Sequence, residues 1–213
     1  SKECKKNDIF FAIKGTKIDG NKFITNAIKN GAKTIISDLK FQGYKDNVLF
    51  LNSKNPRKTL AEVSSAYYKK KPQNLVAVTG TNGKTSIANF FFQIMKLNKK
   101  KIASIGTLGV NSNNFNFKLR NTTLDPLKLS KILEDLKRKR INTVILEASS
   151  HGLKQNRLDG LLFDIGIFTN LSRDHLDYHR SFNDYFNSKM ILFKKLMKKK
   201  STLIFNSNSK YSS

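Results

Sequence analysis

A short glycine-bounded loop between an apolar run and an amphipathic segment constrains this chain most strongly. Residues 75–78 are apolar and bounded by turn-forming residues, which predicts a buried parallel strand. Residues 80–83 form the loop, and apolar side chains then recur at helical spacing over residues 87–97. A strand, a tight loop and a helix in this order direct backbone N–H groups and a helix N-terminus toward an anion. The segment therefore predicts a phosphate-binding loop.

Two residues at the end of this loop carry the matching chemistry. Lys84 is placed to reach the terminal phosphates of a nucleotide, and the Thr85 hydroxyl is placed to ligate Mg²⁺. The spacing is Gly-x-x-Gly-Lys-Thr, with two residues between the glycines where the common phosphate loop has four. Val78 therefore stands where the longer loop would have its first glycine. A strand–turn–helix with an incidental lysine is the alternative, but Gly-Lys-Thr stands where the mechanism requires it. The predicted ATP contacts are Gly80, Thr81, Asn82, Gly83, Lys84, Thr85 and Ser86.

Strand-like and helix-like segments alternate along the whole chain, which predicts an α/β fold. Residues 1–71 form a first block, which we expect to be a small α/β domain. Pro72 marks a linker, and residues 74–213 form a second block that starts with the phosphate loop. We expect this second block to be a P-loop-type domain built on a parallel sheet.

The composition excludes some classes of protein and leaves others open. The net charge is +25, and three lysine runs each follow a predicted helix. Clustered lysines are typical of nucleic-acid binding, but they also suit the solvated C-terminal ends of helices, and without a nucleic-acid-binding motif we favour the second interpretation. One cysteine permits no internal disulfide, and the chain shows neither a long apolar run nor a signal peptide at its start. We therefore expect a cytoplasmic protein.

Polar residues follow the predicted strands, where open α/β sheets bind their ligands. Glu147 ends the apolar run of residues 143–146, and its carboxylate is suited to a nucleotide-bound Mg²⁺; a buried ion pair is the alternative. His175 follows another strand and is a candidate metal ligand or base, or a structural residue like His151 and His179. The residue pattern alone indicates that Lys189 lies on a solvated helix face.

These residues together resemble the Mur ligase family of peptidoglycan synthesis. The similarity runs through nearly the whole chain, at residues 8–15, 19–20, 79–85, 121–123, 147–157 and 169–179. The last two segments, residues 147–157 and 169–179, are the ones most specific to this family. Residues 80–85 alone indicate only the wider superfamily, which includes folylpolyglutamate synthase. Within the family, the chain is most similar to ligases that add the third peptide residue to UDP-N-acetylmuramoyl-L-alanyl-D-glutamate.

The resemblance implies an ATP- and Mg²⁺-dependent ligase that forms a carbon–nitrogen bond through an acyl phosphate. The amino acid added would be a diamino acid, with meso-diaminopimelate favoured over L-lysine. The implied catalytic residues are Lys84, Glu147, His175 and Lys189. The implied metal ligands are Thr85, Glu147, His175 and Lys189, the last as a carbamate formed with CO₂. The implied contacts to the UDP-muramoyl-dipeptide are Ser1, Thr16, Lys17, Ile18, Asn121, Thr122, Thr123, Ser149, Gln155 and Arg157.

The resemblance also implies that this chain is a fragment. Family members are more than twice as long, so we expect it to begin inside the uridine-nucleotide-binding domain and to end inside the ATPase domain. The C-terminal ligase domain, which selects the amino acid, would be absent, and the fragment would bind nucleotide weakly without turnover. We expect a monomer that inserts into no membrane and binds no specific nucleic acid. A folylpolyglutamate-synthase-like ligase and a basic nucleic-acid-binding module stay open as alternatives.

Overall fold

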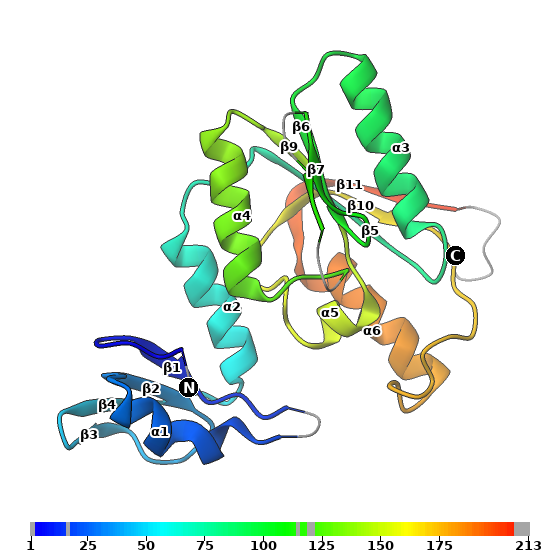
Figure 1. The fold of residues 1–213 in the computed structure, drawn as a ribbon. Coiled ribbons are helices and arrows are strands. Elements are labelled where there is room, and N and C mark those ends of the chain that lie inside the picture. The colour runs from blue at the N-terminus through cyan, green and yellow to red at the C-terminus, as the bar shows by residue number, and fades with distance from the viewer. Residues whose placement is uncertain (1–2, 16–17, 114–115, 119–121, 207–213) are drawn as a thin grey trace. The chain divides into compact units, whose positions relative to one another are not determined.

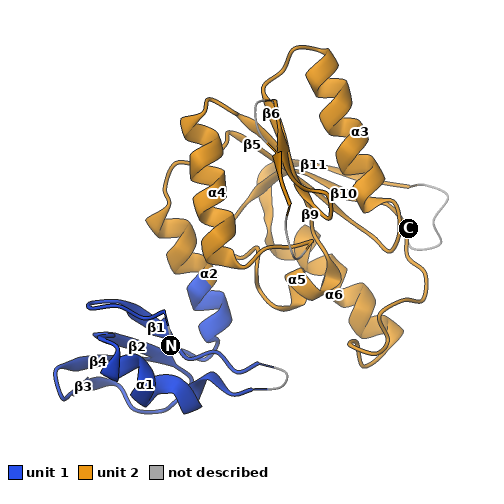
Figure 2. Cartoon of the chain, viewed as in Figure 1, with its two compact units in different colours: residues 1–60 blue, residues 61–213 orange. Residues whose placement is uncertain are grey.

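The computed structural model describes residues 3–15, 18–113, 116–118 and 122–206. The chain divides into two compact units, residues 1–60 and residues 61–213 (Figure 2). The division lies within helix α2 (Pro56–Tyr67), so the two halves of this helix belong to different units.

Unit 1 is a small α/β unit with a four-stranded sheet in the order β1-β2-β4-β3. Strands β1, β2 and β4 are parallel, and β3 pairs with β4 in the antiparallel sense. A short 3₁₀ turn leads into α1, whose Ala27 packs with Ile35 and Val48 in a small apolar core. The elements of unit 1 before α2 are β1 (Ile9–Phe11), η1 (Gly20–Phe23), α1 (Ile24–Lys29), β2 (Thr34–Ser37), β3 (Gly43–Lys45) and β4 (Val48–Asn52).

Unit 2 is built on a seven-stranded sheet in the order β11-β10-β5-β9-β6-β7-β8 (Figure 1). The first five strands in this order are parallel, and β7 and β8 add an antiparallel edge. The elements after α2 are β5 (Asn74–Thr79), α3 (Lys84–Leu97), β6 (Ile102–Gly106), β7 (Gly109–Ser112), β8 (Asn116–Phe117), α4 (Pro126–Arg138), β9 (Thr143–Glu147), α5 (Ser150–Lys154), β10 (Phe163–Phe168), α6 (Phe182–Lys195) and β11 (Met197–Phe205).

The central strands of unit 2 are buried on both faces, as their continuous apolar sequences require. On one face Val76 and Val78 pack against Ala88 of α3. On the other face Ala77 belongs to a larger core that includes Leu133 of α4. Because β5, β9 and β10 are parallel and neighbouring, their carboxyl ends lie at one edge of the sheet. That edge receives the loops that carry the candidate site residues.

Helix α4 shows how local sequence produces this packing. Asp125 precedes the helix, and its carboxylate accepts a hydrogen bond from the Lys128 N–H at 3.1 Å, with Pro126 in the first turn. Leu129, Leu133 and Leu136, at helical spacing, are buried in the core, whereas the remaining face is mainly polar and carries the exposed Leu127.

The α/β prediction, with a mainly parallel sheet in the second block, is confirmed. The glycine- and asparagine-rich stretch after β6 contains strands β7 and β8. Among the described residues, no helix combines the length and apolar character that crossing a membrane demands.

Replacement of Leu133, which is fully buried in the α4 core, tests this packing. Leu133→Ala should lower the free energy of unfolding by about 2–5 kcal/mol, because it removes buried methyl groups and leaves a cavity. Leu127→Ala on the same helix is the matched control, because Leu127 is 49% exposed, and it should cost less than about 1 kcal/mol. Urea unfolding followed by circular dichroism measures both; equal costs would contradict the packing described.

Candidate active site

The loop between β5 and α3 is held by the end of strand β10. Gly80 has φ of 146°, and a Cβ atom at this position would overlap the Thr169 hydroxyl oxygen, so only glycine fits. The Thr81 N–H donates to the Asn170 carbonyl oxygen at 3.0 Å. The Asn82 N–H donates to the Asn170 side-chain oxygen at 3.0 Å. The loop conformation is therefore fixed by the neighbouring strand, without a ligand.

Lys84 folds back over the loop. Its Nζ donates to the carbonyl oxygens of Gly80 at 3.0 Å and Thr81 at 2.7 Å. Burial lowers the pKa of Lys84, whereas the nearby carboxylates of Glu147 and Asp174 oppose that shift. The first N–H groups of α3 have no carbonyl partner within the helix, and the helix dipole adds positive potential there. Together these groups gather N–H donors and positive potential at one place, which is the chemistry that binding a phosphate requires.

Glu147, at the end of β9, faces this loop. Its carboxylate is buried and accepts hydrogen bonds from the Thr85 hydroxyl at 2.8 Å and from the Thr107 N–H at 2.8 Å. A Cβ atom on Gly106 would overlap the carboxylate, so the close approach of Glu147 to β6 depends on that glycine. A hydroxyl and a carboxylate in contact beside a phosphate loop are the oxygen donors that Mg²⁺ prefers.

No group of three or more histidine, cysteine or acidic residues within the described ranges is arranged to hold a metal ion by itself. Mg²⁺ commonly binds through one or two carboxylates and takes its other ligands from substrate phosphates and water, and Glu147 with the Thr85 hydroxyl supplies such oxygen donors. The residues present therefore fit an ion that arrives with a nucleotide.

Lys189 lies inside the protein, so the interpretation of it as a solvated helix residue is wrong. It is 1% exposed, and its Nζ donates to the Gly80 carbonyl oxygen at 2.6 Å. The same Nζ lies 4.2 Å from the centre of the Tyr185 ring. Burial lowers the pKa of Lys189 to about 7, with a further lowering by Lys84 and a smaller opposing effect of Asp174. Lys189 is therefore an amine that is partly neutral near pH 7.

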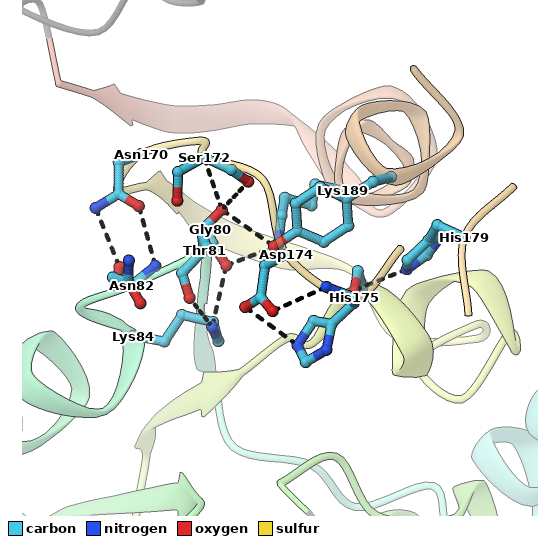
Figure 3. Close-up of polar contacts among 12 residues, drawn as sticks. Gly80, Thr81, Asn82, Lys84, Asn170, Ser172, Asp174, His175, His179 and Lys189 are labelled. Carbon is cyan, nitrogen blue, oxygen red and sulfur yellow. Dashed lines mark hydrogen bonds and ion pairs between the residues drawn. The ribbon is translucent and has the colours of Figure 1, made fainter. Parts of the chain in front are cut away.

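Asp174 and His175 follow β10 and lie beside Gly80, Thr81 and the two lysines (Figure 3). The Asp174 carboxylate accepts a hydrogen bond from the His175 N–H at 2.8 Å, and the His175 Nε2 lies 3.6 Å from it. The His175 backbone has φ of 53°, which is unusual for a residue with a side chain, and its side chain is 47% exposed. This histidine is therefore accessible at the edge of the site.

The other two histidines are held by packing. His179 is buried, and its Nε2 lies 3.0 Å from the Ser150 hydroxyl. The His151 ring stacks on Tyr178 with ring centres 4.0 Å apart. These contacts agree with the structural roles expected for both.

A second polar cluster adjoins Glu147. The Thr123 hydroxyl lies 3.0 Å from that of Ser149 and donates to the Glu147 carbonyl oxygen at 3.0 Å. Arg157 donates to the Thr123 carbonyl oxygen at 2.6 Å and to the Gln155 side-chain oxygen at 2.7 Å. These predicted substrate contacts thus form a connected group beside the phosphate loop.

The remaining predicted contacts are placed differently. The Thr122 hydroxyl lies 3.1 Å from that of Thr107, which joins it to the Glu147 environment. Ser86 is exposed in the first turn of α3. Ile18 belongs to unit 1 and is 59% exposed. The predicted contacts outside the described residues are Ser1, Thr16, Lys17 and Asn121.

Sequence reasoning missed two residues of this site. Thr107 binds both oxygens of Glu147, with its hydroxyl 3.2 Å from the second. The sequence feature that could have identified Thr107 is a hydroxyl side chain directly after an apolar, strand-like run. Asp174 lies near both lysines, and its signal was an acidic residue beside His175 at another strand end.

The chain is similar to ligases of peptidoglycan synthesis in comparisons with known proteins. Residues 78–213 match the profile described as the Mur ligase middle domain, and residues 1–77 match that of the Mur ligase family catalytic domain. The UDP-N-acetylmuramoyl-L-alanyl-D-glutamate–2,6-diaminopimelate ligase of Clostridium tetani is 42% identical over 199 residues, which cover 91% of this chain and 41% of that relative. The same-named ligase of Brucella melitensis is 40% identical over 212 residues, which cover 100% of this chain and 43% of the relative.

Solved structures agree with these relatives. A structure of a UDP-N-acetylmuramoyl-L-alanyl-D-glutamate–2,6-diaminopimelate ligase matches with a TM-score of 0.84 and 31% identity, over 98% of this chain and 42% of that one. The MurF ligase from Thermotoga maritima in complex with ADP matches with a TM-score of 0.58 and 25% identity, over 96% of this chain and 44% of that one. The FolC protein of E. coli shares the fold alone. It matches with a TM-score of 0.54 and 16% identity, over 72% of this chain and 47% of that one.

This chain spans less than half the length of the curated relatives it matches. The middle-domain profile nevertheless covers the larger part of the chain, including the phosphate loop, Glu147 and Lys189. The chain belongs to the Mur ligase family.

Proposed function

We propose that this chain supplies the nucleotide-binding part, and part of the substrate-binding part, of an ATP-dependent amide-bond ligase of peptidoglycan precursor synthesis. The proposed substrates are UDP-N-acetylmuramoyl-L-alanyl-D-glutamate and a diamino acid, meso-diaminopimelate. The names of the relatives, at 42% and 40% identity, support this substrate pair. The fragment alone would not complete the reaction.

One observation carries the proposal: the Thr85 hydroxyl contacts the Glu147 carboxylate at 2.8 Å directly beside the phosphate loop. Thr85 follows β5 and Glu147 ends β9, so the parallel sheet joins two loops far apart in sequence. Lys84 donates to the loop carbonyl oxygen of Gly80, and its pKa is lowered by burial, against the opposing effect of the nearby Glu147 carboxylate. This arrangement supports binding of a magnesium nucleotide.

Lys84 and the loop N–H groups would bind the phosphates of ATP. In the structure the Lys84 ammonium is satisfied by two carbonyl oxygens, which a phosphate would replace as acceptors. The loop N–H groups are held in place by the protein, and Lys84 would turn from these carbonyl oxygens to the phosphate, where both would stabilise the charge on the transferring phosphoryl group.

Thr85, Glu147 and His175 would hold Mg²⁺, which when bound neutralises charge on the phosphates. Lys189 would join them as a carbamate. Its neutral amine would attack the carbon of CO₂, forming a nitrogen–carbon bond as one carbon–oxygen double bond opens to an oxyanion, and the nitrogen would lose one proton to solvent. A neutral amine would thus become an anionic oxygen donor. This step requires a neutral amine, and the burial of Lys189 supports it.

The second polar cluster would orient the muramoyl-dipeptide. Arg157 presents a planar fork suited to a carboxylate, steadied by Gln155 and by the Thr123 carbonyl oxygen. The substrate carboxylate would then attack the γ-phosphorus, ADP would leave, and the incoming amine would displace phosphate from the acyl phosphate.

The finer assignments belong to the same proposal. Residues 1–71 would bind the uridine nucleotide, through Ile18 together with Ser1, Thr16 and Lys17. Residues 74–213 would bind ATP. Asn121, Thr122 and Ser149 would contact the dipeptide. The protein would be monomeric and would work in the cytoplasm.

Replacement of Lys84 tests the phosphate site. Lys84→Ala should weaken binding of magnesium ADP to the chain by about 10- to 100-fold, because a charge-assisted hydrogen bond is lost. Lys96→Ala, in the last turn of the same helix, is the matched control and should leave binding unchanged. Isothermal titration calorimetry measures both, and equal affinities for the two variants would contradict the site.

The buried amine of Lys189 predicts a pH-dependent stability. The folded-state pKa of about 7 is below the ordinary 10.5, so between these values the unfolded chain binds a proton that the folded chain does not. Stability relative to Lys189→Met should therefore rise as the pH increases from 7 to 10.5. Thermal unfolding of both proteins across this range measures the difference, and a constant difference would refute a depressed pKa.

The activity itself is tested in a longer version that covers the remaining length of the relatives. ADP release should require both the UDP-muramoyl-dipeptide and the diamino acid, because each carries one half of the new amide bond. A coupled assay for ADP measures this, with the Lys84→Ala version as the inactive control. Release that is independent of the dipeptide would exclude this ligase activity.

A further inference from the structure

Basic residues gather where the parallel strands of unit 2 begin. Residues 69–71 precede β5, residues 99–101 precede β6, and residues 137–140 precede β9. Residues 194–200 end α6 and open β11. We call these four segments the basic edge. In sequence they are separate runs, and only the sheet order brings them to the same side of unit 2.

The basic edge is compact enough for its charges to act together. Strands β11 and β6 are separated by four strand spacings, which is about 19 Å. The Debye length at physiological salt is about 8 Å, so each basic segment lies within about one screening length of the next. Their potentials therefore add rather than being screened one by one.

Most of this charge is uncompensated. Lys99, Lys100 and Lys101 are exposed, as are Lys199 and Lys200, and none of these five forms an ion pair with another described residue. Within the described ranges, the carboxylates that flank these segments are few. Glu134 pairs with Arg138 at 2.9 Å, Asp164 pairs with Lys198 at 2.6 Å, and Asp135 is a third.

The helix dipole accounts for only part of the basic edge. Lys137 and Arg138 lie in the last turn of α4, and Lys194 and Lys195 in the last turn of α6, where the dipole favours cations. Residues 99–101 lie beyond Asn98, the C-cap of α3, and residues 198–200 lie in a strand. Strand β11 is irregular there: Phe163 pairs with Met197 but Ile165 pairs with Thr202, so the three lysines bulge out of the pairing. A preference for helix ends would not place cations at these positions.

The basic edge also does not serve the phosphate site. Parallel strands of five or six residues separate the two edges by about 17–20 Å, which is about two Debye lengths. The opposite edge carries its own acidic groups, among them Glu147, Asp174 and Asp177. An anion drawn to the basic edge would therefore be held away from the nucleotide loop.

Exposed apolar side chains project among these cations. Leu97, at the end of α3, is 82% exposed, and Leu162, just before β10, is 52% exposed. Tyr67, at the end of α2 and two residues before Lys69, is 76% exposed. Lysines interspersed with leucine and tyrosine are typical of surfaces that bind membrane interfaces, where the lysines meet anionic headgroups.

We propose that the basic edge of unit 2 is a docking surface for an anionic lipid bilayer, with the active-site edge turned away from the lipid. A nucleic acid is a less suitable partner for the basic edge than an anionic bilayer. Lysine predominates over arginine in the basic edge, and of the three exposed apolar side chains named above only Tyr67 offers a ring on which a base could stack. The proposal does not depend on the ligase function.

Sedimentation with lipid vesicles tests the proposal on the 213-residue chain. The chain should bind vesicles of phosphatidylcholine containing about one third phosphatidylglycerol, and it should not bind pure phosphatidylcholine. Binding should disappear near 1 M salt, where the Debye length falls to about 3 Å. A fourfold variant should bind at least about tenfold more weakly. Its substitutions are Lys99→Gln, Lys100→Gln, Lys199→Gln and Lys200→Gln.

The matched control removes the same charge elsewhere, from exposed lysines of unit 1, and should lose less than about threefold. Its substitutions are Lys29→Gln, Lys40→Gln, Lys45→Gln and Lys54→Gln. Circular dichroism and binding of magnesium ADP confirm that each variant is folded. Equal losses in the two variants would overturn the proposal, because net charge alone would then explain binding. It would also be overturned by no binding to anionic vesicles, or by lysine-dependent binding of a single-stranded oligonucleotide that outcompetes the vesicles.

Discussion

Two lysine amines donate to one carbonyl oxygen, that of Gly80, and the candidate site is built around this contact. Lys84 approaches it from α3 at 3.0 Å and Lys189 from α6 at 2.6 Å. Two ammonium groups this close repel each other, and Lys84 accordingly helps to lower the pKa of Lys189. The loop conformation that presents this oxygen is held in turn by Thr169 and Asn170 at the end of β10.

This arrangement gives the two lysines different chemical roles. Burial lowers the pKa of Lys84, but the carboxylates of Glu147 and Asp174 oppose this shift and favour its charged form. Lys189 is more deeply buried, with its amine over the Tyr185 ring, and is partly neutral near pH 7. The same residue type thus lies in two different electrostatic settings within one site. Only burial and neighbouring charges distinguish them.

The sequence predicts the parts of the site whose chemistry is local. The phosphate loop was recognised because Gly-Lys-Thr must stand between a strand and a helix, and Glu147 because an acid ends an apolar strand. The burial of Lys189 was missed because a lysine lowers the apolar character of its helix face, although Tyr185 and Leu192 are buried on the same face. The contact of Thr107 with Glu147 depends on β6 lying beside β9, and strand order is not encoded in local pattern.

The fold was predicted to a similar degree. Periodicity located the long helices and the central strands, whereas residues 20–29 form a 3₁₀ turn followed by α1. Asp19 accepts a hydrogen bond from the Asn21 N–H at 2.9 Å and starts the tighter turn, a local effect that periodicity does not register. The gathering of the basic runs at one edge likewise required the sheet topology.

A crystal structure of the chain with magnesium and a non-hydrolysable ATP analogue tests the central claim most directly. The account predicts the terminal phosphate against residues 80–85, with Lys84 turned from its carbonyl partners toward that phosphate. It also predicts the metal ion in contact with the Thr85 hydroxyl and beside the Glu147 carboxylate. A nucleotide bound elsewhere, or a metal ion remote from Glu147, would contradict it.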